Sequence, residues 1–226
     1  MKKDKCITVD VNKVIVYFAG MILLALGIVI NSKVSLGVSP IISVAYISSE
    51  LTGLKFGDVS FVWYGIFVIV EMIVRICQKN KKQLILDILQ LPVSLIFTRF
   101  MNLFSGYIPM FEETFSHNFL GTFAGRVMVL MIAIILTGLG AAMALNTGYI
   151  PNPGDGIVKA LSDITGKGTG FVKNCFDAFC VSCTFLIGLI SGKAFVGIGV
   201  GTILAMLLVG RVMWIYGKIF IKKESL

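Results

Sequence analysis

Six runs of apolar residues, each long enough to cross a lipid bilayer as a helix, constrain this chain more than any other feature. They cover residues 14–30, 56–76, 84–104, 122–145, 171–190 and 195–216. A crossing needs about 17–25 mostly apolar residues. Inside hydrocarbon the backbone must satisfy its own hydrogen bonds, so runs of this length form helices. The sequence therefore predicts an all-α membrane protein with a single domain over residues 1–226.

The composition supports this class and excludes a nucleic-acid partner. Only 14% of the residues are charged, whereas soluble domains carry about 25%. The net charge of +8 does not come from a basic stripe with interleaved aromatic residues, which a nucleic-acid surface would need. The basic residues lie mostly in short segments between the apolar runs, and the expected environment is the lipid bilayer.

The distribution of basic residues predicts the orientation. One set precedes the first run, follows the second, surrounds residues 153–165 and ends the chain: Lys2, Lys3, Lys5, Lys13, Arg75, Lys79, Lys81, Lys82, Lys159, Lys167, Lys173, Lys218, Lys222 and Lys223. The opposite side would hold only Lys33, Lys55, Lys193 and Arg126. Because cytoplasmic loops carry excess Lys and Arg, we expect a multi-pass protein of the bacterial plasma membrane with both termini cytoplasmic.

The two halves of the chain repeat one another at a distance of 113 positions. Leu26–Gly27 matches Leu139–Gly140, Pro40 matches Pro153, Thr52–Gly53 matches Thr165–Gly166, and Gly57 matches Gly170. This offset is half of the 226-residue length. Such self-similarity indicates an internal duplication, with one repeat over about 14–104 and the other over about 122–217.

Each repeat contains a short helix between two of its apolar runs. Asn152 can cap a helix that has Pro153 at its first position, where the missing N–H of proline costs nothing. Gly166 after Thr165 is a typical helix stop. Ser39 and Pro40 open the matching helix over 40–52. Both helices are too short to span hydrocarbon about 30 Å thick.

Each repeat has three spans, which is an odd number, so the two repeats must insert with opposite orientation. We therefore expect two inverted three-helix repeats, each with a short interrupted or re-entrant helix. In transporters of this architecture, the binding site lies at the repeat interface near the interrupted helices.

The segments L-G-V-S-P with a following T-G, P-G-D-G with T-G, and V-G-I-G with G-T-I-L occur in this order. In these motifs the chain resembles the YczE/YitT-like bacterial membrane proteins from about Gly20 to Lys218. The resemblance implies a six-span fold. It implies no catalytic or binding residues, because these proteins are largely of unassigned function.

The starts of the two short helices are the first candidate binding residues. Free N–H groups and the helix dipole attract anions at a helix N-terminus. Glycines there allow a ligand to approach the backbone. The candidates are Ser39, Pro40, Asn152, Pro153, Gly154 and Gly156. The alternative is that both are interfacial helices that only join spans.

Four charged residues are further candidates. In the third spans, residues 95–101 match residues 207–213 at an offset of 112 positions, so Arg99 and Arg211 occupy equivalent places. An arginine in a span either faces the interior or extends to the headgroups. Asp177 within the fifth span could carry a proton, pair with an arginine or form an interhelical hydrogen bond. Asp155 could be a cavity carboxylate, or could only complement the dipole of its own helix.

Enzyme chemistry has little support in the sequence. The single histidine is His117, in the loop between the halves, which argues against a His-based triad or a zinc enzyme. Cys180 and Cys183 have no second pair or histidine nearby and are interpreted as small residues of an apolar helix. We therefore expect no catalytic residues, no metal and no cofactor, and a protein that is not an enzyme.

The leading functional hypothesis is a small-solute transporter that works by alternating access. The chain has no ATPase motif, so a gradient would drive it, and the charges at the expected site favour an anionic substrate. One alternative is the substrate-binding subunit of an energy-coupling-factor transporter, which would have an ATPase partner. Another is a non-transporting membrane helper or scaffold. A second copy of the chain also remains open as a partner.

The orientation can be tested in a cysteine-free background that carries a single cysteine at position 112. We expect a membrane-impermeant maleimide to label this cysteine from outside the cell, since residues 105–121 are predicted to be external. Labelling from the cytoplasmic side alone would contradict the orientation.

Overall fold

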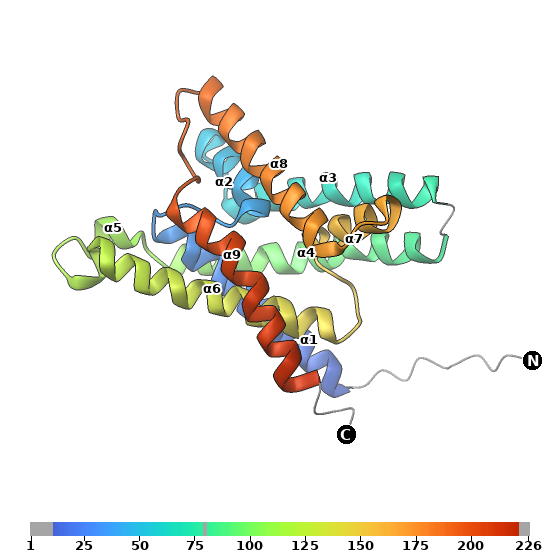
Figure 1. Cartoon of the computed structure of the whole chain (residues 1–226). Coiled ribbons are helices and arrows are strands. Elements are labelled where there is room, and N and C mark those ends of the chain that lie inside the picture. The colour runs from blue at the N-terminus through green and yellow to red at the C-terminus, as the bar shows by residue number, and fades with distance from the viewer. Residues whose placement is uncertain (1–10, 79–80, 222–226) are drawn as a thin grey trace, which may run out of the picture.

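A computed structural model describes residues 11–78 and 81–221, and the regular elements in this part of the chain are helices (Figure 1). They are α1 (Val11–Lys33), α2 (Pro40–Thr52), α3 (Phe56–Cys77), α4 (Lys81–Tyr107), α5 (Phe111–Thr114), η1 (Phe119–Gly121), α6 (Phe123–Asn146), α7 (Pro153–Thr165), α8 (Thr169–Ile190), α9 (Val200–Tyr216) and η2 (Gly217–Ile221). Six segments, built on α1, α3, α4, α6, α8 and α9, are long and apolar enough to cross a membrane. The predicted all-α fold with six spans is confirmed.

Part of the predicted basic set lies outside the described residues. These are Lys2, Lys3, Lys5, Lys79, Lys222 and Lys223. The first five spans begin and end within a few residues of the predicted limits, whereas the sixth does not.

The sixth span begins at Val200 instead of at residue 195. Gly197 has a left-handed φ of 79°, which interrupts the helix although the local residues are apolar. The backbone here bonds to the segment after α1: Val38 N–H donates to the Gly197 carbonyl at 3.0 Å, and Gly201 N–H donates to the Leu36 carbonyl at 2.6 Å. These long-range bonds hold residues 191–199 as a loop.

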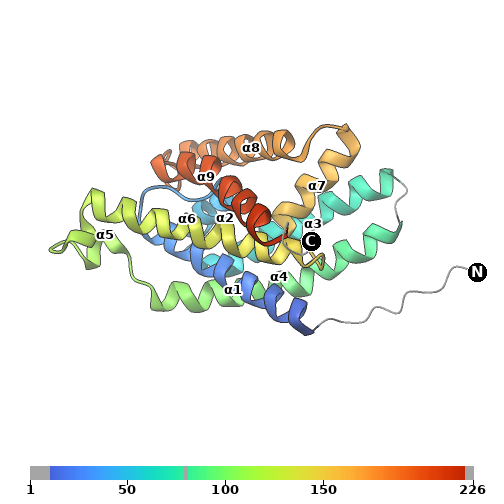
Figure 2. The same ribbon diagram turned by 60° about the horizontal axis from the view of Figure 1, so that its bottom comes forward.

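Helices α1 and α6 run antiparallel through the centre of the bundle and touch backbone to backbone (Figure 2). A Cβ atom built on Gly27 would lie 2.8 Å from the Ala133 carbonyl oxygen and 2.6 Å from the Thr137 nitrogen. One built on Gly140 would lie 2.6 Å from the Gly20 carbonyl oxygen and would collide with the Leu24 nitrogen. Small residues are what permit such close approach between membrane helices.

The other helices pack around this central pair. Helix α4 packs against α1, and α9 packs against α6. The short helix α2 packs against α3 and α8, while the short helix α7 packs against α8 and α3. Each short helix therefore contacts a span of its own half and a span of the other half.

We predict that Gly140→Val destabilises the protein, because its side chain has no space against α1. Overpacking of a tight interface costs on the order of 1–3 kcal/mol. The measurement is thermal denaturation in detergent. Gly65→Val is the control, since Gly65 lies in α3 with open space around its Cβ position. Equal melting temperatures for the two variants would contradict the tight crossing.

Candidate functional site

The two short helices have the same local structure. Each has 13 residues, begins with a proline and is followed by a left-handed glycine, Gly53 with φ 69° or Gly166 with φ 66°. The glycine N–H donates to the carbonyl of Ser49 or Ser162, which completes the C-terminal cap. At the other end, the Asn152 side chain accepts from the Gly154 N–H at 3.3 Å. The two predicted helices are confirmed, with the predicted ends.

The N-termini of both short helices border one space of about 60 Å³, which we call the central cavity. Its walls are Leu24, Ile28, Ser39, Ile41, Ile42, Tyr64, Thr137, Ala141, Asn152, Gly154, Asp155, Lys173, Val209 and Met213. At about 10–15 Å³ for each water, the space holds only a few water molecules. A larger solute would need the bundle to open.

Most of the walls come in pairs that are 113 positions apart. The pairs are Leu24 with Thr137, Ile28 with Ala141, Ser39 with Asn152, Ile41 with Gly154, and Ile42 with Asp155. Because equivalent residues of both halves face the same space, the central cavity lies where the two halves meet.

Charge reaches the central cavity from α7 and α8. Lys173 and Asp155 line it, and the Lys173 ammonium lies 4.0 Å from the carboxylate of Asp177. Burial raises the pKa of Asp155, and the Lys173 charge opposes that rise. The Asp177 side chain is buried, and its Oδ1 has no hydrogen-bond partner within residues 11–78 and 81–221. The positive charge of Lys173 is therefore near the carboxyl groups of Asp155 and Asp177 and near the N-termini of α2 and α7.

The structure places the remaining predicted residues elsewhere. Arg99 is 62% exposed and pairs with Asp58 across α3 and α4 at 2.9 Å. Arg211 is also exposed, and neither arginine lines the central cavity. Pro40 is buried at the start of α2. Pro153 borders a smaller cavity of about 20 Å³ together with Asn152.

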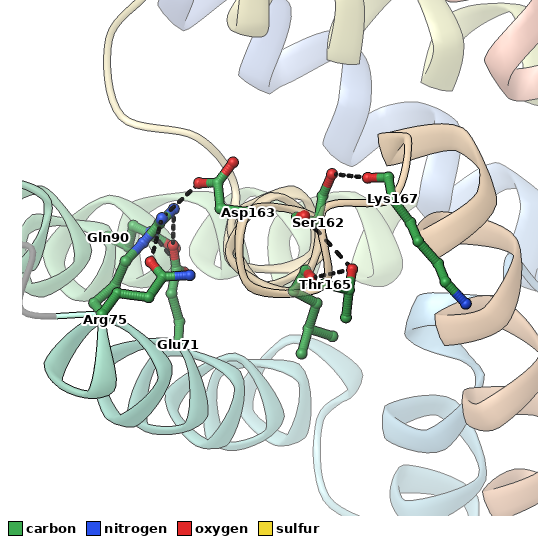
Figure 3. A network of polar contacts seen from close by, with 9 residues as sticks. Glu71, Arg75, Gln90, Ser162, Asp163, Thr165 and Lys167 are labelled. Atoms are coloured by element: carbon green, nitrogen blue, oxygen red, sulfur yellow. Dashed lines mark hydrogen bonds and ion pairs between the residues drawn. The ribbon is translucent and has the colours of Figure 1, made fainter.

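Gly156 faces a polar cluster between α3, α4 and α7, and does not line the central cavity. In this cluster Arg75 donates to Asp163 at 2.6 Å and lies 3.9 Å from Glu71, while Gln90 donates to Glu71 at 2.9 Å (Figure 3). Asp87 interacts electrostatically with Glu71 and Arg75. Four members of this cluster, Glu71, Arg75, Asp87 and Gln90, are at most 2% exposed.

This cluster was not among the predicted site residues, although the sequence contains a signal for it. Glu71 and Arg75 lie four positions apart on one face of an apolar span, and Asp87 and Gln90 lie three apart on the next span. Ionisable residues within membrane spans usually face the bundle interior and pair with one another.

A wider space of about 560 Å³, which we call the vestibule, adjoins the central cavity. Its walls are Leu145, Gly148, Tyr149, Pro151, Asp155, Val158, Lys159, Asp163, Thr169, Gly170, Lys173, Gly210 and Met213. Asp155, Lys173 and Met213 belong to both spaces. These three side chains therefore separate the vestibule from the central cavity.

The vestibule exists because the start of α8 and the end of α9 lie apart, as Figure 1 shows. A Cβ built on Gly170 or on Gly210 meets nothing within 4 Å. The matching residues of the first half are Gly57 and Thr98. They are in contact, because a Cβ on Gly57 would collide with the Thr98 carbonyl. The same junction is thus closed in the first half and open in the second.

A further groove of about 790 Å³ lies between α3, α7 and α8. Apolar side chains such as Phe67, Phe171 and Phe176 form most of its walls. Lys167 stands at its edge, with its ammonium 4.9 Å from the centre of the Phe171 ring.

The pKa of Asp155 provides a test of the charged wall. A carboxyl whose pKa is raised in the folded state binds its proton more tightly there, so its contribution to stability is lost as pH rises from the ordinary 3.8 through the raised value. We predict that the melting temperature of Asp155→Asn rises relative to that of wild type as pH increases. Lys173→Gln should make wild-type Asp155 more unfavourable at high pH and so steepen the pH dependence.

The slope with pH is the readout of this test, because Asn also loses the favourable contact of a carboxylate with the helix dipole at every pH. A difference in melting temperature that does not change with pH would contradict the raised pKa.

Comparison with known proteins assigns the family. The model of the family described as "Family of unknown function (DUF6198)" matches residues 11–218. The chain is 26% identical over 200 residues to the "Uncharacterized membrane protein YczE" of Bacillus subtilis (strain 168), covering 87% of this chain and 81% of that protein. No solved structure matches. The predicted relation to YczE-like membrane proteins is confirmed, and the chain belongs to the DUF6198 family, whose function is unknown.

Proposed function

We propose that this protein moves a small solute across the membrane by alternating access, with the central cavity as the substrate site and with two inverted repeats as the moving parts. The observation that carries the proposal is the combination of a cavity walled by equivalent residues of both halves with a junction that is closed in one half and open in the other.

The helix contacts support the inverted repeat. Gly27 contacts Ala133 and Thr137. Its equivalent 113 positions later, Gly140, contacts Gly20 and Leu24, which are the equivalents of Ala133 and Thr137. The same correspondence relates the packing of α2 on α8 to that of α7 on α3, and the packing of α1 on α4 to that of α6 on α9. This pattern of contacts is what two repeats related by a two-fold axis in the plane of the membrane would have.

The unequal junctions support alternating access. If each half can adopt both the open and the closed junction, the opposite state has the closed junction in the second half and the open junction in the first. Gly170 of α8 would then close against Gly210 of α9, as Gly57 closes against Thr98 now. The matching junction at Gly57 would open on the other side. Rocking of one repeat against the other around a fixed site is a common transporter mechanism.

The basic residues indicate which side of the membrane the vestibule faces. Lys159 and Lys173 line the vestibule, and the positive-inside rule assigns this end to the cytoplasm. The present arrangement is therefore the inward-open state of the proposed cycle, in a protein of the bacterial plasma membrane with both termini cytoplasmic.

The chemistry of the walls favours a solute that carries an anionic group. Two helix N-termini supply partial positive charge, and Lys173 adds a full charge that Asp155 and Asp177 partly offset. Asn152 and Ser39 provide polar groups at the two N-termini. In this proposal the protein is a transporter and not an enzyme, and the solute gradient or a coupled ion supplies the energy.

The test uses Ser39→Cys in a background without the five native cysteines. The Ser39 side chain makes no capping hydrogen bond in α2, so the substitution leaves the helix start intact. In oriented vesicles, we predict that a small membrane-impermeant thiol reagent modifies this cysteine rapidly from the vestibule side and more slowly from the other side. Modification from one side only, under all conditions, would contradict alternating access.

Adding Gly170→Val separates the two states. Valine fits the present arrangement, because nothing lies within 4 Å of that position, but it obstructs the closed junction of the other state. We therefore expect modification from the opposite side to fall at least tenfold, while modification from the vestibule side persists. Gly65→Val, at an open position of α3 away from both junctions, is the control and should change neither rate.

A further inference from the structure

The polar cluster of Glu71, Arg75, Asp87, Gln90 and Asp163 has more negative groups than its single cation can balance. Arg75 bonds to Asp163 at 2.6 Å and lies 3.9 Å from Glu71. Asp87 is then a further carboxyl, 2% exposed, that interacts with Glu71 on the neighbouring helix. Two buried carboxyls that share one site do not both ionise.

Unpartnered atoms in the cluster point to a bound proton. Asp87 Oδ2 and Gln90 Oε1 are both buried and have no hydrogen-bond partner among the described residues. They belong to side chains one helical turn apart on the same face of α4. A proton on the carboxyl pair supplies a donor, and removes one of two adjacent negative charges.

The geometry points to Glu71 and Asp87 as a proton-binding site that holds one exchangeable proton between two carboxyl groups. The groups facing this pair are Arg75 from α3, Gln90 from α4 and Asp163 from α7. The side chain of Asp163 is 46% exposed and lines the vestibule. Arg75 contacts both Asp163 and Glu71, so the cluster that contains the buried pair reaches the vestibule.

The site is placed to influence the central cavity. A Cβ on Gly156 would lie 2.5 Å from Glu71 Oε2 and 2.8 Å from Gln90 Nε2, so the cluster rests on the first turn of α7. Gly154 and Asp155 of the same turn line the central cavity. Ionised carboxylates attract the partial positive charge of this helix start, and loss of one negative charge on protonation weakens that attraction. The proton would thus be the coupling ion, a role that rests on the proposed transport function.

The equivalent contact, between α2 and α8, is neutral. Ser43 corresponds to Gly156 and Thr184 to Glu71, and their hydroxyl groups lie 2.7 Å apart. Arg75 corresponds to Gly188 at the same offset. Since the charged contact is present beside α7 and not beside α2, protonation acts on one short helix and not on the other.

The site is tested by infrared spectroscopy of the full chain in lipid bilayers at neutral pH, without any solute. Wild type should give the carbonyl band of one buried protonated carboxylic acid, shifted in deuterium oxide. The band should be lost in both Glu71→Gln and Asp87→Asn, because the remaining carboxyl ionises beside Arg75. Asp58→Asn, at a 42% exposed carboxylate, should retain it.

Wild type with carbon-13 in Asp or Glu carboxyl groups keeps the test independent of how the variants fold, because the label shifts the same band. A wild-type spectrum without a protonated carboxyl, or a band that persists in both variants, would overturn the site. The measurement needs no transport, so a failure of the transport proposal leaves its outcome unaffected. If Ser39→Cys is accessible from both sides but this band is absent, the cycle stands and the proton site fails.

Discussion

The structure depends on the backbone contact between α1 and α6. Membrane helices gain little from the hydrophobic effect against each other, because lipid is as apolar as their side chains, and close packing of small residues replaces it. Here Gly20 and Gly27 of α1 meet Gly140 and Ala133 of α6. The same contact brings the starts of the short helices α2 and α7 to one cavity. The wall residues of that cavity therefore come from both halves of the chain.

The polar groups of the bundle are distributed unequally around this centre. Beside α2, the short helix of the first half, the neutral Ser43–Thr184 pair joins α2 to α8. Beside α7, the short helix of the second half, the charged cluster around Glu71 and Arg75 joins α7 to α3 and α4. The junction of Gly57 with Thr98 is closed, whereas that of Gly170 with Gly210 is open. In the proposed cycle, these differences between the two short helices and between the two junctions would make the cycle directional and couple it to an ion.

The sequence was sufficient where local chemistry decides the structure. Hydropathy predicted the spans, and a proline before and a glycine after each short helix predicted both of its ends. Prediction was less successful where distant residues decide. The loop that ends at Val200 is apolar, and only its bonds to Leu36 and Val38 keep it from continuing the span.

The same limit applies to the charges. Arg99 could not be assigned a partner without knowing that Asp58 lies beside it on α3. Lys173 was counted among the basic residues of a cytoplasmic segment, and its place in the cavity wall follows from the packing of α8 beside α7. Gly156 was expected to let a ligand approach the backbone, but the groups that lie against it are the side chains of Glu71 and Gln90 from other helices.

The most direct test of the central claim is a pair of distance distributions from spin labels in lipid bilayers. One pair of labels would be placed at positions 55 and 103, across the closed junction, and the other at the equivalent positions 168 and 215, across the open one. All four positions are exposed. The account predicts a short-distance and a long-distance population for each pair. When the short-distance fraction of the 168–215 pair increases, the long-distance fraction of the 55–103 pair should increase by the same amount. A single unchanging distance for each pair, at every pH tested, would contradict it.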